Sequence, residues 1–134
     1  MATIKSYTSL DQSKKLTGIL SIESADCFWD YDELQKFHRI NWFEDGYNKN
    51  SQLLLNENNV CAWSLDALFN VIPQEIFDGE YIINITVGKD YKWIITYDHY
   101  NWTEHTYPGL STGANNLIDA CYEIILKLHE RKLL

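Results

Sequence analysis

The apolar pattern between residues 81 and 107 is typical of β-strands, in which side chains alternate between two faces. Residues 81–87 and 91–97 are rich in β-branched and aromatic side chains, and residues 88–90 between them have the composition of a hairpin loop. In the second segment Trp93, Ile95 and Tyr97 share one face, which we expect to be the core side. A third strand over residues 102–107 completes an antiparallel meander, which Pro108-Gly109 ends.

A longer period, typical of a helix, follows near the C-terminus. Five apolar residues form one stripe: Leu117, Cys121, Ile124, Ile125 and Leu128. This stripe predicts a helix over residues 115–131 that lies on the sheet and is capped by Asn115 or Asn116.

Two shorter helices are predicted from their start signals. Ser9 and Gln12 have the spacing of a capping box and predict a helix over residues 9–20. Ser64 has the position of a cap for a helix over residues 64–72, which Pro73 ends. Residues 73–77 can add one further helical turn.

The segment from residue 21 to 59 has no helical period. Residues 27–31 and 38–43 are aromatic-rich and can pair as two short strands. Between residues 48 and 59, turn-forming amides flank three leucines, which predicts a long exposed loop or the end of a hairpin. Together these elements predict one α+β domain over residues 1–134, with a sheet around residues 81–107 packed against the C-terminal helix.

Composition narrows the class of partner. The 134 residues contain 19 acids against 11 bases, a formal net charge of -8, so direct binding to a nucleic-acid backbone is not expected. The 5 Trp, 9 Tyr and 5 Phe exclude a disordered chain. No apolar run follows Met1 and none approaches the ~20 residues of a membrane span, so we expect a cytoplasmic protein without a membrane segment.

Residues 97–107 carry the densest set of functional side chains. As one continuous strand they would place His99 and His105 ~20 Å apart, so these histidines could share a metal ion only across a turn near residues 100–101. The alternatives are an ordinary polar sheet face and an exposed surface that binds a partner or ligand. We take the candidate binding surface to be Tyr100, Trp102, Glu104 and His105. No metal site is predicted.

No catalytic residue or cofactor is predicted. The chain has no nucleophile elbow, no phosphate-binding glycine loop and no zinc-protease motif. An acidic group at residues 23–33 fails as a calcium loop, because Gln35 stands where glycine is needed. The cysteines are Cys27, Cys61 and Cys121, an odd number without the spacing of a disulfide framework or zinc site, and Cys121 lies on the apolar helical stripe.

Three stretches, residues 10–26, 62–68 with Ile72-Pro73, and 117–129, resemble a family of small uncharacterised proteins of gut anaerobes, often carried on phages or mobile elements. The C-terminal half is more weakly similar to small phage domains in which a tryptophan-bearing hairpin precedes an amphipathic helix. The resemblance implies a cytoplasmic accessory or binding role and assigns no activity.

We therefore predict a non-enzymatic binding or accessory protein that uses an acidic and aromatic surface against a host protein. The alternatives are a small-ligand or nucleotide-binding protein and a weak hydrolase. No sequence feature assigns an oligomeric state.

Overall fold

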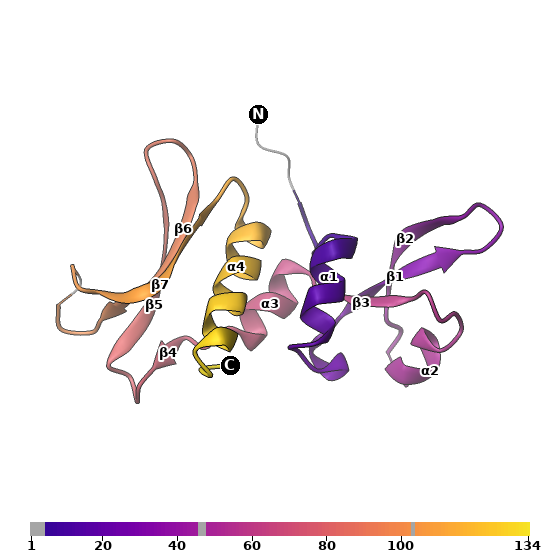
Figure 1. The fold of residues 1–134 in the computed structure, drawn as a ribbon, viewed down its shortest axis with the longest axis horizontal. Helices are drawn as coiled ribbons and strands as arrows, with labels where there is room; N and C mark the ends of the chain where they lie inside the picture. Colours follow the sequence, from indigo (N-terminus) through magenta and orange to yellow (C-terminus); the bar gives the residue numbers. More distant parts are fainter. Residues whose placement is uncertain (1–4, 46–47, 103) are drawn as a thin grey trace. The chain divides into compact units, whose positions relative to one another are not determined.

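The structure is a computed structural model that describes residues 5–45, 48–102 and 104–134. The described residues form two compact units (Figure 1). The N-terminal unit is Ser6–Ala67, and the C-terminal unit is Leu68–Leu134 together with Lys5. Each unit is described by itself.

The N-terminal unit contains a small antiparallel sheet with short helices. Helix α1 (Leu10–Thr17) begins at the predicted capping box, in which Gln12 N–H donates to Ser9 Oγ at 3.2 Å and Ser9 N–H donates to Gln12 Oε1 at 3.0 Å. A 3-10 turn, η1 (Ile22–Ser24), leads into β1 (Cys27–Asp32), which pairs with β2 (Phe37–Trp42) and with β3 (Val60–Ala62). The strand order is β2-β1-β3, which confirms the predicted pairing of the two aromatic segments.

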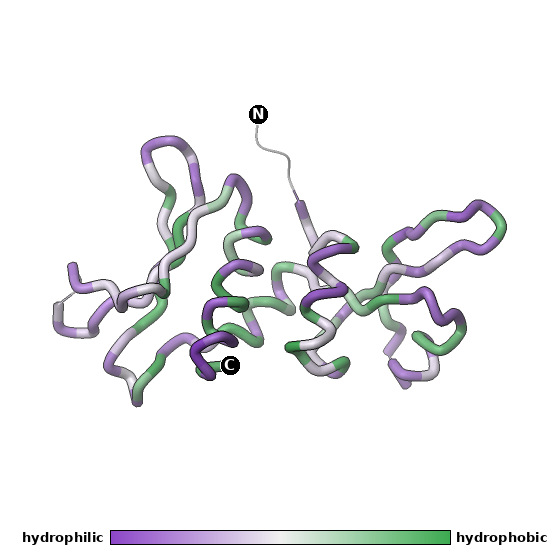
Figure 2. Tube along the Cα trace, in the orientation of Figure 1, coloured by the Kyte–Doolittle hydropathy of each residue, from purple (hydrophilic) through white to green (hydrophobic). Residues whose placement is uncertain are grey.

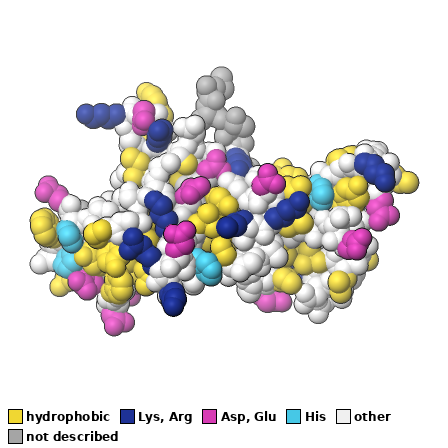
Figure 3. Space-filling model, viewed as in Figure 1, with side chains coloured by type: hydrophobic (Ala, Val, Ile, Leu, Met, Phe, Trp, Pro, Cys, Tyr) yellow, Lys and Arg dark blue, Asp and Glu magenta, His cyan; other side chains and the backbone are white. Residues whose placement is uncertain are grey.

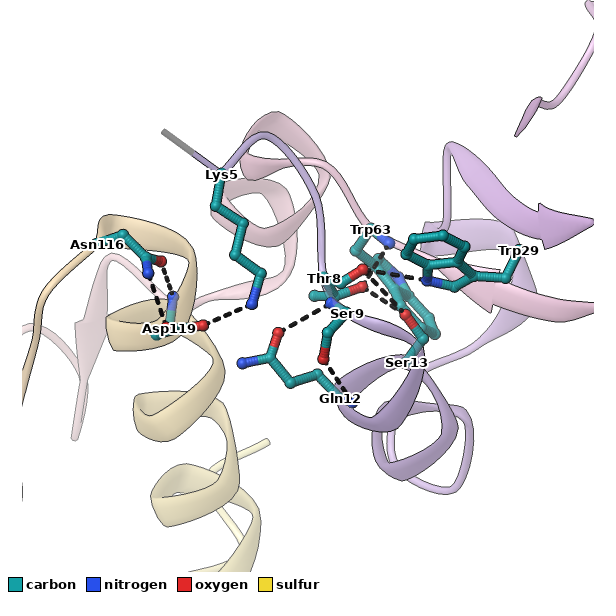
Figure 4. A network of polar contacts seen from close by, with 9 residues as sticks. All are labelled: Lys5, Thr8, Ser9, Gln12, Ser13, Trp29, Trp63, Asn116 and Asp119. Atoms are coloured by element: carbon teal, nitrogen blue, oxygen red, sulfur yellow. Dashed lines mark hydrogen bonds and ion pairs between the residues drawn. The ribbon is translucent and has the colours of Figure 1, made fainter. Parts of the chain in front are cut away.

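Trp63 is the centre of this unit's core. Its side chain is fully buried, and its indole N–H donates to Ser24 Oγ at 2.9 Å. Its backbone N–H donates to the hydroxyl of buried Thr8, which lies 2.7 Å from the Ser13 hydroxyl (Figure 4). The Trp29 indole donates to the Thr8 carbonyl at 3.2 Å. These buried polar groups of Thr8, Ser13 and Trp63 therefore each have a hydrogen-bond partner, as a low-dielectric interior requires.

Helix α3 (Leu65–Val71) leads into the second unit, where β4 (Glu75–Ile76), β5 (Tyr81–Val87), β6 (Trp93–His99) and β7 (Thr106–Ala114) form an antiparallel sheet in sequential order. The final helix, α4 (Leu117–Glu130), packs against β6 and β7. In Figure 2, apolar and hydrophilic residues alternate along α4, as expected for a helix with one buried face.

The core of this unit lies between α4 and one face of the sheet. Ile95 and Tyr97 of β6 are fully buried, as predicted, and the Tyr97 hydroxyl donates to the Pro73 carbonyl at 2.5 Å. Four of the five residues of the apolar stripe on α4 are buried, and Leu117, in the first turn of the helix, is half-buried. Asn116 caps the helix by accepting the Asp119 N–H at 2.9 Å, and Lys5 forms an ion pair with Asp119 at 2.8 Å (Figure 4). The α+β class, the antiparallel sheet and the C-terminal helix are confirmed, whereas one domain over residues 1–134 stays a prediction.

The third strand was predicted in the wrong place. The described residues Trp102, Glu104 and His105 lie in a turn where a strand was expected, and β7 begins only at Thr106 and continues through Pro108-Gly109. Pro108 does not end the strand because it lies on an edge strand between Thr106 and Ser111, where the register with β6 shifts and a missing N–H breaks no ladder. The β5–β6 loop is also longer than predicted, since β6 begins at Trp93.

Two further predictions, for residues 73–77 and for the segment after residue 48, are wrong. Residues 75–76 form β4, which pairs with β5, and add no helical turn. Part of the expected loop after residue 48 is a short helix, α2 (Lys49–Leu53), because the Asn48 side chain accepts the N–H groups of Asn50 and Ser51 at its start. Among the described residues no helix is both long and apolar enough to cross a membrane.

Gly109→Ala is expected to lower the free energy of unfolding of the C-terminal unit by about 1–2 kcal/mol, the usual cost of a left-handed backbone for a residue with a Cβ. Gly109 has a φ of 81°, and a Cβ there would overlap the guanidinium of Arg131, which also lies 5.7 Å from the Tyr107 ring centre. Urea unfolding measures the effect. Gly113→Ala is the matched control in the same strand, since the nearest atom to its Cβ would be 4.0 Å away. Equal effects of the two substitutions would contradict this explanation.

Candidate functional site

The candidate residues Tyr100, Trp102, Glu104 and His105 all lie in the turn between β6 and β7. Backbone hydrogen bonds hold this turn: His99 N–H donates to the His105 carbonyl at 2.9 Å, and His105 N–H donates to the Trp102 carbonyl at 2.9 Å. The Tyr100 N–H donates at 3.0 Å to the carbonyl of Glu80, the residue that precedes β5. The turn is therefore fixed both within itself and to the neighbouring strand.

The two large aromatic side chains of the turn are exposed but ordered by stacking. Trp102 is 60% exposed and Tyr100 is 63% exposed. The Trp102 ring stacks on His105 with centres 4.9 Å apart and planes 12° apart, and Tyr100 stacks on His99 at 4.8 Å. Stacking restricts both rings before any partner arrives, which reduces the entropy that binding would cost.

A buried tyrosine supports this exposed layer. Tyr81 is 8% exposed, and its ring contacts His99 edge-on at 5.4 Å and Tyr107 edge-on at 5.1 Å. Phe77 and His105 also lie beside it. We call this set of seven residues the ring cluster: Phe77, Tyr81, His99, Tyr100, Trp102, His105 and Tyr107. Sequence reasoning missed Phe77, Tyr81 and Tyr107, because only the pairing of distant strands brings them to the turn.

Three acidic side chains lie beside or next in sequence to the ring cluster. Glu104 is an exposed member of the turn, and a Glu80 carboxylate oxygen lies 3.8 Å from His99 Nε2. Asp78 is exposed in the turn that leads from Phe77 to β5. Figure 3 shows histidine, hydrophobic and acidic side chains together at the left end of the view. Among the described residues, the guanidinium of Arg131 lies over the ring of Tyr107, a member of the cluster.

A hollow of about 290 Å³ borders the ring cluster, lined by Ile82, Ile83, Asn84, Asp98, His99 and Tyr100. Asp98 is only 9% exposed, and its carboxylate accepts three hydrogen bonds, from Asn84 Nδ2 at 2.9 Å, Thr96 Oγ1 at 3.2 Å and Thr106 Oγ1 at 2.7 Å. Sequence reasoning did not single out this group. Its signal was the alternation of Thr96 and Asp98 on the side of the strand away from the core.

The turn brings the two histidines together, with ring centres 6.5 Å apart. The chain is not one continuous strand here, because β6 ends at His99 and β7 begins at Thr106, and the two histidines meet across the turn that a shared metal ion would need. Within the described part of the chain, however, no three His, Cys, Asp or Glu side chains are grouped so that they could hold a metal ion.

The other candidate groups have structural partners. Asp26 accepts the backbone N–H of Ser64 at 2.9 Å and also its hydroxyl, and Asp32 accepts the N–H groups of the β1–β2 turn. The three cysteines are buried and unpaired with one another. Burial raises the pKa of the Cys121 thiol to about 12, which leaves it protonated and a poor nucleophile near neutral pH.

Comparisons of this chain with protein-family models, with curated proteins and with solved structures found no match.

Proposed function

We propose that this protein is a non-enzymatic binding protein that contacts a basic partner protein through Tyr100, Trp102, Glu104 and His105. The observation that carries the proposal is that Trp102 and Tyr100 are more than half exposed while both are held by stacking on histidines. Interface hot spots are enriched in Trp and Tyr, and a pre-ordered aromatic anchor binds at a lower entropic cost.

The charge of the chain indicates the kind of partner. A net charge of -8, with Glu80 and Glu104 beside the rings, attracts basic surfaces and repels acidic ones. The resemblance to proteins of phages and mobile elements extends the proposal to a cytoplasmic host protein as the partner. Direct nucleic-acid binding is not part of the proposal, because an acidic surface repels phosphate.

A small-ligand binding protein is the second candidate. The hollow lined by Asn84, Asp98 and Tyr100 supports it, since polar groups converge there beside an aromatic ring. A small ligand would occupy the hollow alone, whereas a protein partner would also cover Trp102. No described group of residues favours a hydrolase.

Trp102→Ala is expected to weaken partner binding by about 2 kcal/mol, roughly thirtyfold in Kd, and to leave the melting temperature nearly unchanged. The tagged protein is used to capture partners from a nuclease-treated bacterial lysate at low and high salt, and the captured protein is then purified and titrated by calorimetry. We expect capture to survive the nuclease and to fall at high salt, because screening shortens the reach of charge steering.

Trp42→Ala is the matched control, since Trp42 is 51% exposed on β2 in the other unit. It should leave the calorimetric Kd unchanged. A large fall in melting temperature for Trp102→Ala with binding intact would show that Trp102 stabilises the fold and would remove it from the contact surface.

A further inference from the structure

We propose that the hollow beside the ring cluster receives an arginine side chain of the partner, with Asp98 as its counter-ion and Tyr100 as its stacking surface. This inference rests on the proposed function and names the chemical group that the partner must present.

The hollow lies on the side of the sheet that α4 does not cover. Ile95 and Tyr97 point to the buried face, so the alternating residues Thr96 and Asp98 lie on the opposite face. The antiparallel register places Ile82 opposite Asp98 and Asn84 opposite Thr96. The neighbouring strands β5 and β6 thus each line one side of the hollow. Tyr100 lies at its edge and is 63% exposed.

Asp98 is a carboxylate whose hydrogen-bond partners are all uncharged. Its three donors are an amide and two hydroxyls, and among the described residues no Lys, Arg or His forms an ion pair with it. A carboxylate offers about four acceptor positions. Oδ2 accepts two hydrogen bonds and Oδ1 accepts one, so one position on Oδ1 is left for a donor. A buried charge without a counter-ion is costly, and a cation that enters the hollow would offset that cost.

The lining favours a guanidinium over an ammonium group. A guanidinium is planar, weakly hydrated and stacks on aromatic faces, whereas an ammonium is a compact and strongly hydrated charge. The ring of Tyr100 supplies the aromatic face, because His99 occupies only one side of it. Ile82, which is 46% exposed, supplies an apolar wall for the methylene groups of the arginine stem. One guanidinium N–H then donates to Asp98 Oδ1.

The test is an NMR titration of the full chain with two blocked tripeptides, Ac-Gly-Arg-Gly-NH2 and its citrulline counterpart, which has the same shape without the charge. The arginine peptide should shift the Asn84 side-chain amide and the backbone amides of Ile82, Asp98 and Tyr100. The citrulline peptide should bind about tenfold more weakly, the usual loss for one charge-assisted hydrogen bond. Equal binding of the two peptides, or shifts confined to other residues, would overturn the proposal.

Asp98→Asn should reduce binding of the arginine peptide by a similar factor. The asparagine can keep its oxygen toward Asn84 and Thr96 and donate its amide to the Thr106 hydroxyl, which can turn to accept, so the fold is expected to survive. Asp90→Asn is the matched control, because it removes the same charge from an exposed position in the β5–β6 loop. If Asp98→Asn unfolds the chain, Tyr100→Leu decides: it should weaken binding of the arginine peptide, because it removes the stacking surface, and unchanged binding would overturn the proposal.

Failure of this inference and failure of the proposed function are distinguishable. Trp102 does not line the hollow, so Trp102→Ala should leave tripeptide binding unchanged while it weakens partner capture. If Trp102→Ala weakens capture and the tripeptide does not bind, the arginine inference is wrong and the contact surface stands. If the tripeptide binds at the hollow but capture does not depend on Trp102, the inference about the hollow stands and the proposed contact surface is wrong.

Discussion

Trp63→Ala is expected to lower the free energy of unfolding of the N-terminal unit by about 3–5 kcal/mol, the usual range for removing a buried aromatic side chain. Trp63 is completely buried, so truncation leaves a cavity that the surrounding strands and helices can fill only in part. The substitution also removes the indole N–H that donates to Ser24 Oγ at 2.9 Å. A loss of this size is comparable to the whole stability of a small unit.

Urea unfolding followed by far-ultraviolet circular dichroism measures the loss. Trp42→Ala is the control, because Trp42 lies on the edge strand β2 and is half exposed, so its removal should cost far less. Trp63→Phe separates the two contributions: it keeps most of the apolar volume and loses the hydrogen bond, and should cost about 1–2 kcal/mol. Equal losses for Trp63→Ala and Trp42→Ala would contradict the central place of Trp63 in this core.

The elements predicted best are those whose signals are local. The stripe on α4 and the capping box at Ser9 each depend on residues within one element, and the structure has both within a few residues of the predicted ends. The sequence analysis missed a helix that is too short to show a repeating apolar pattern. Asn48 caps α2, yet five residues cannot show a helical repeat, and the surrounding amides indicated a loop.

The core face of β6 was predicted correctly although the hairpin loop was not. A three-residue loop at 88–90 would pair Val87 with Tyr91, whereas the structure pairs Val87 with Trp93. That difference is a slip of two residues, and side chains alternate with a period of two, so Ile95 and Tyr97 keep the same face. The cross-strand partners change, however. This is why the contact of Asn84 with Asp98 could not be found from the predicted loop.

The candidate surface was predicted by residue type, and its geometry was not. The sequence identifies Tyr100, Trp102, Glu104 and His105 as neighbours along the chain. The stacking of Trp102 on His105 requires a turn, and the register shift between Thr96 and Asp98 that accompanies it is a property of strand pairing. Tyr81 reaches the same cluster only because β5 pairs with β6.

The stability of the folded chain is expected to fall steeply between pH 9 and pH 10. Burial raises the pKa of Cys61 from 9.0 to about 11 and that of Cys121 from 9.0 to about 12. Burial, together with the neighbouring carboxylate of Asp26, raises the pKa of Cys27 further still, and burial also raises the pKa of Tyr97. The folded state therefore holds these protons more tightly than the unfolded state does.

The sign of the effect follows from proton linkage. Below about pH 9 the thiols are protonated in both states, and the stabilisation is fully present. Above it the unfolded chain loses protons that the folded chain retains, so the free energy of unfolding falls by about 1 kcal/mol per thiol between pH 9 and 10, roughly 3 kcal/mol for the three. Cys27 and Cys61 belong to the N-terminal unit and Cys121 to the C-terminal unit, so about two thirds of the loss should fall on the former.

Urea unfolding at pH 8, 9 and 10 in the presence of a reductant measures this dependence. Cys61→Ala should lower stability at every pH, because it leaves a small cavity, and should also make the decline between pH 9 and 10 shallower by about 1 kcal/mol. The change in slope is the decisive readout, since a purely structural loss would shift all three pH values equally. A stability that stays flat from pH 9 to pH 10 would show that the thiols titrate alike in both states and are not buried as the structure has them.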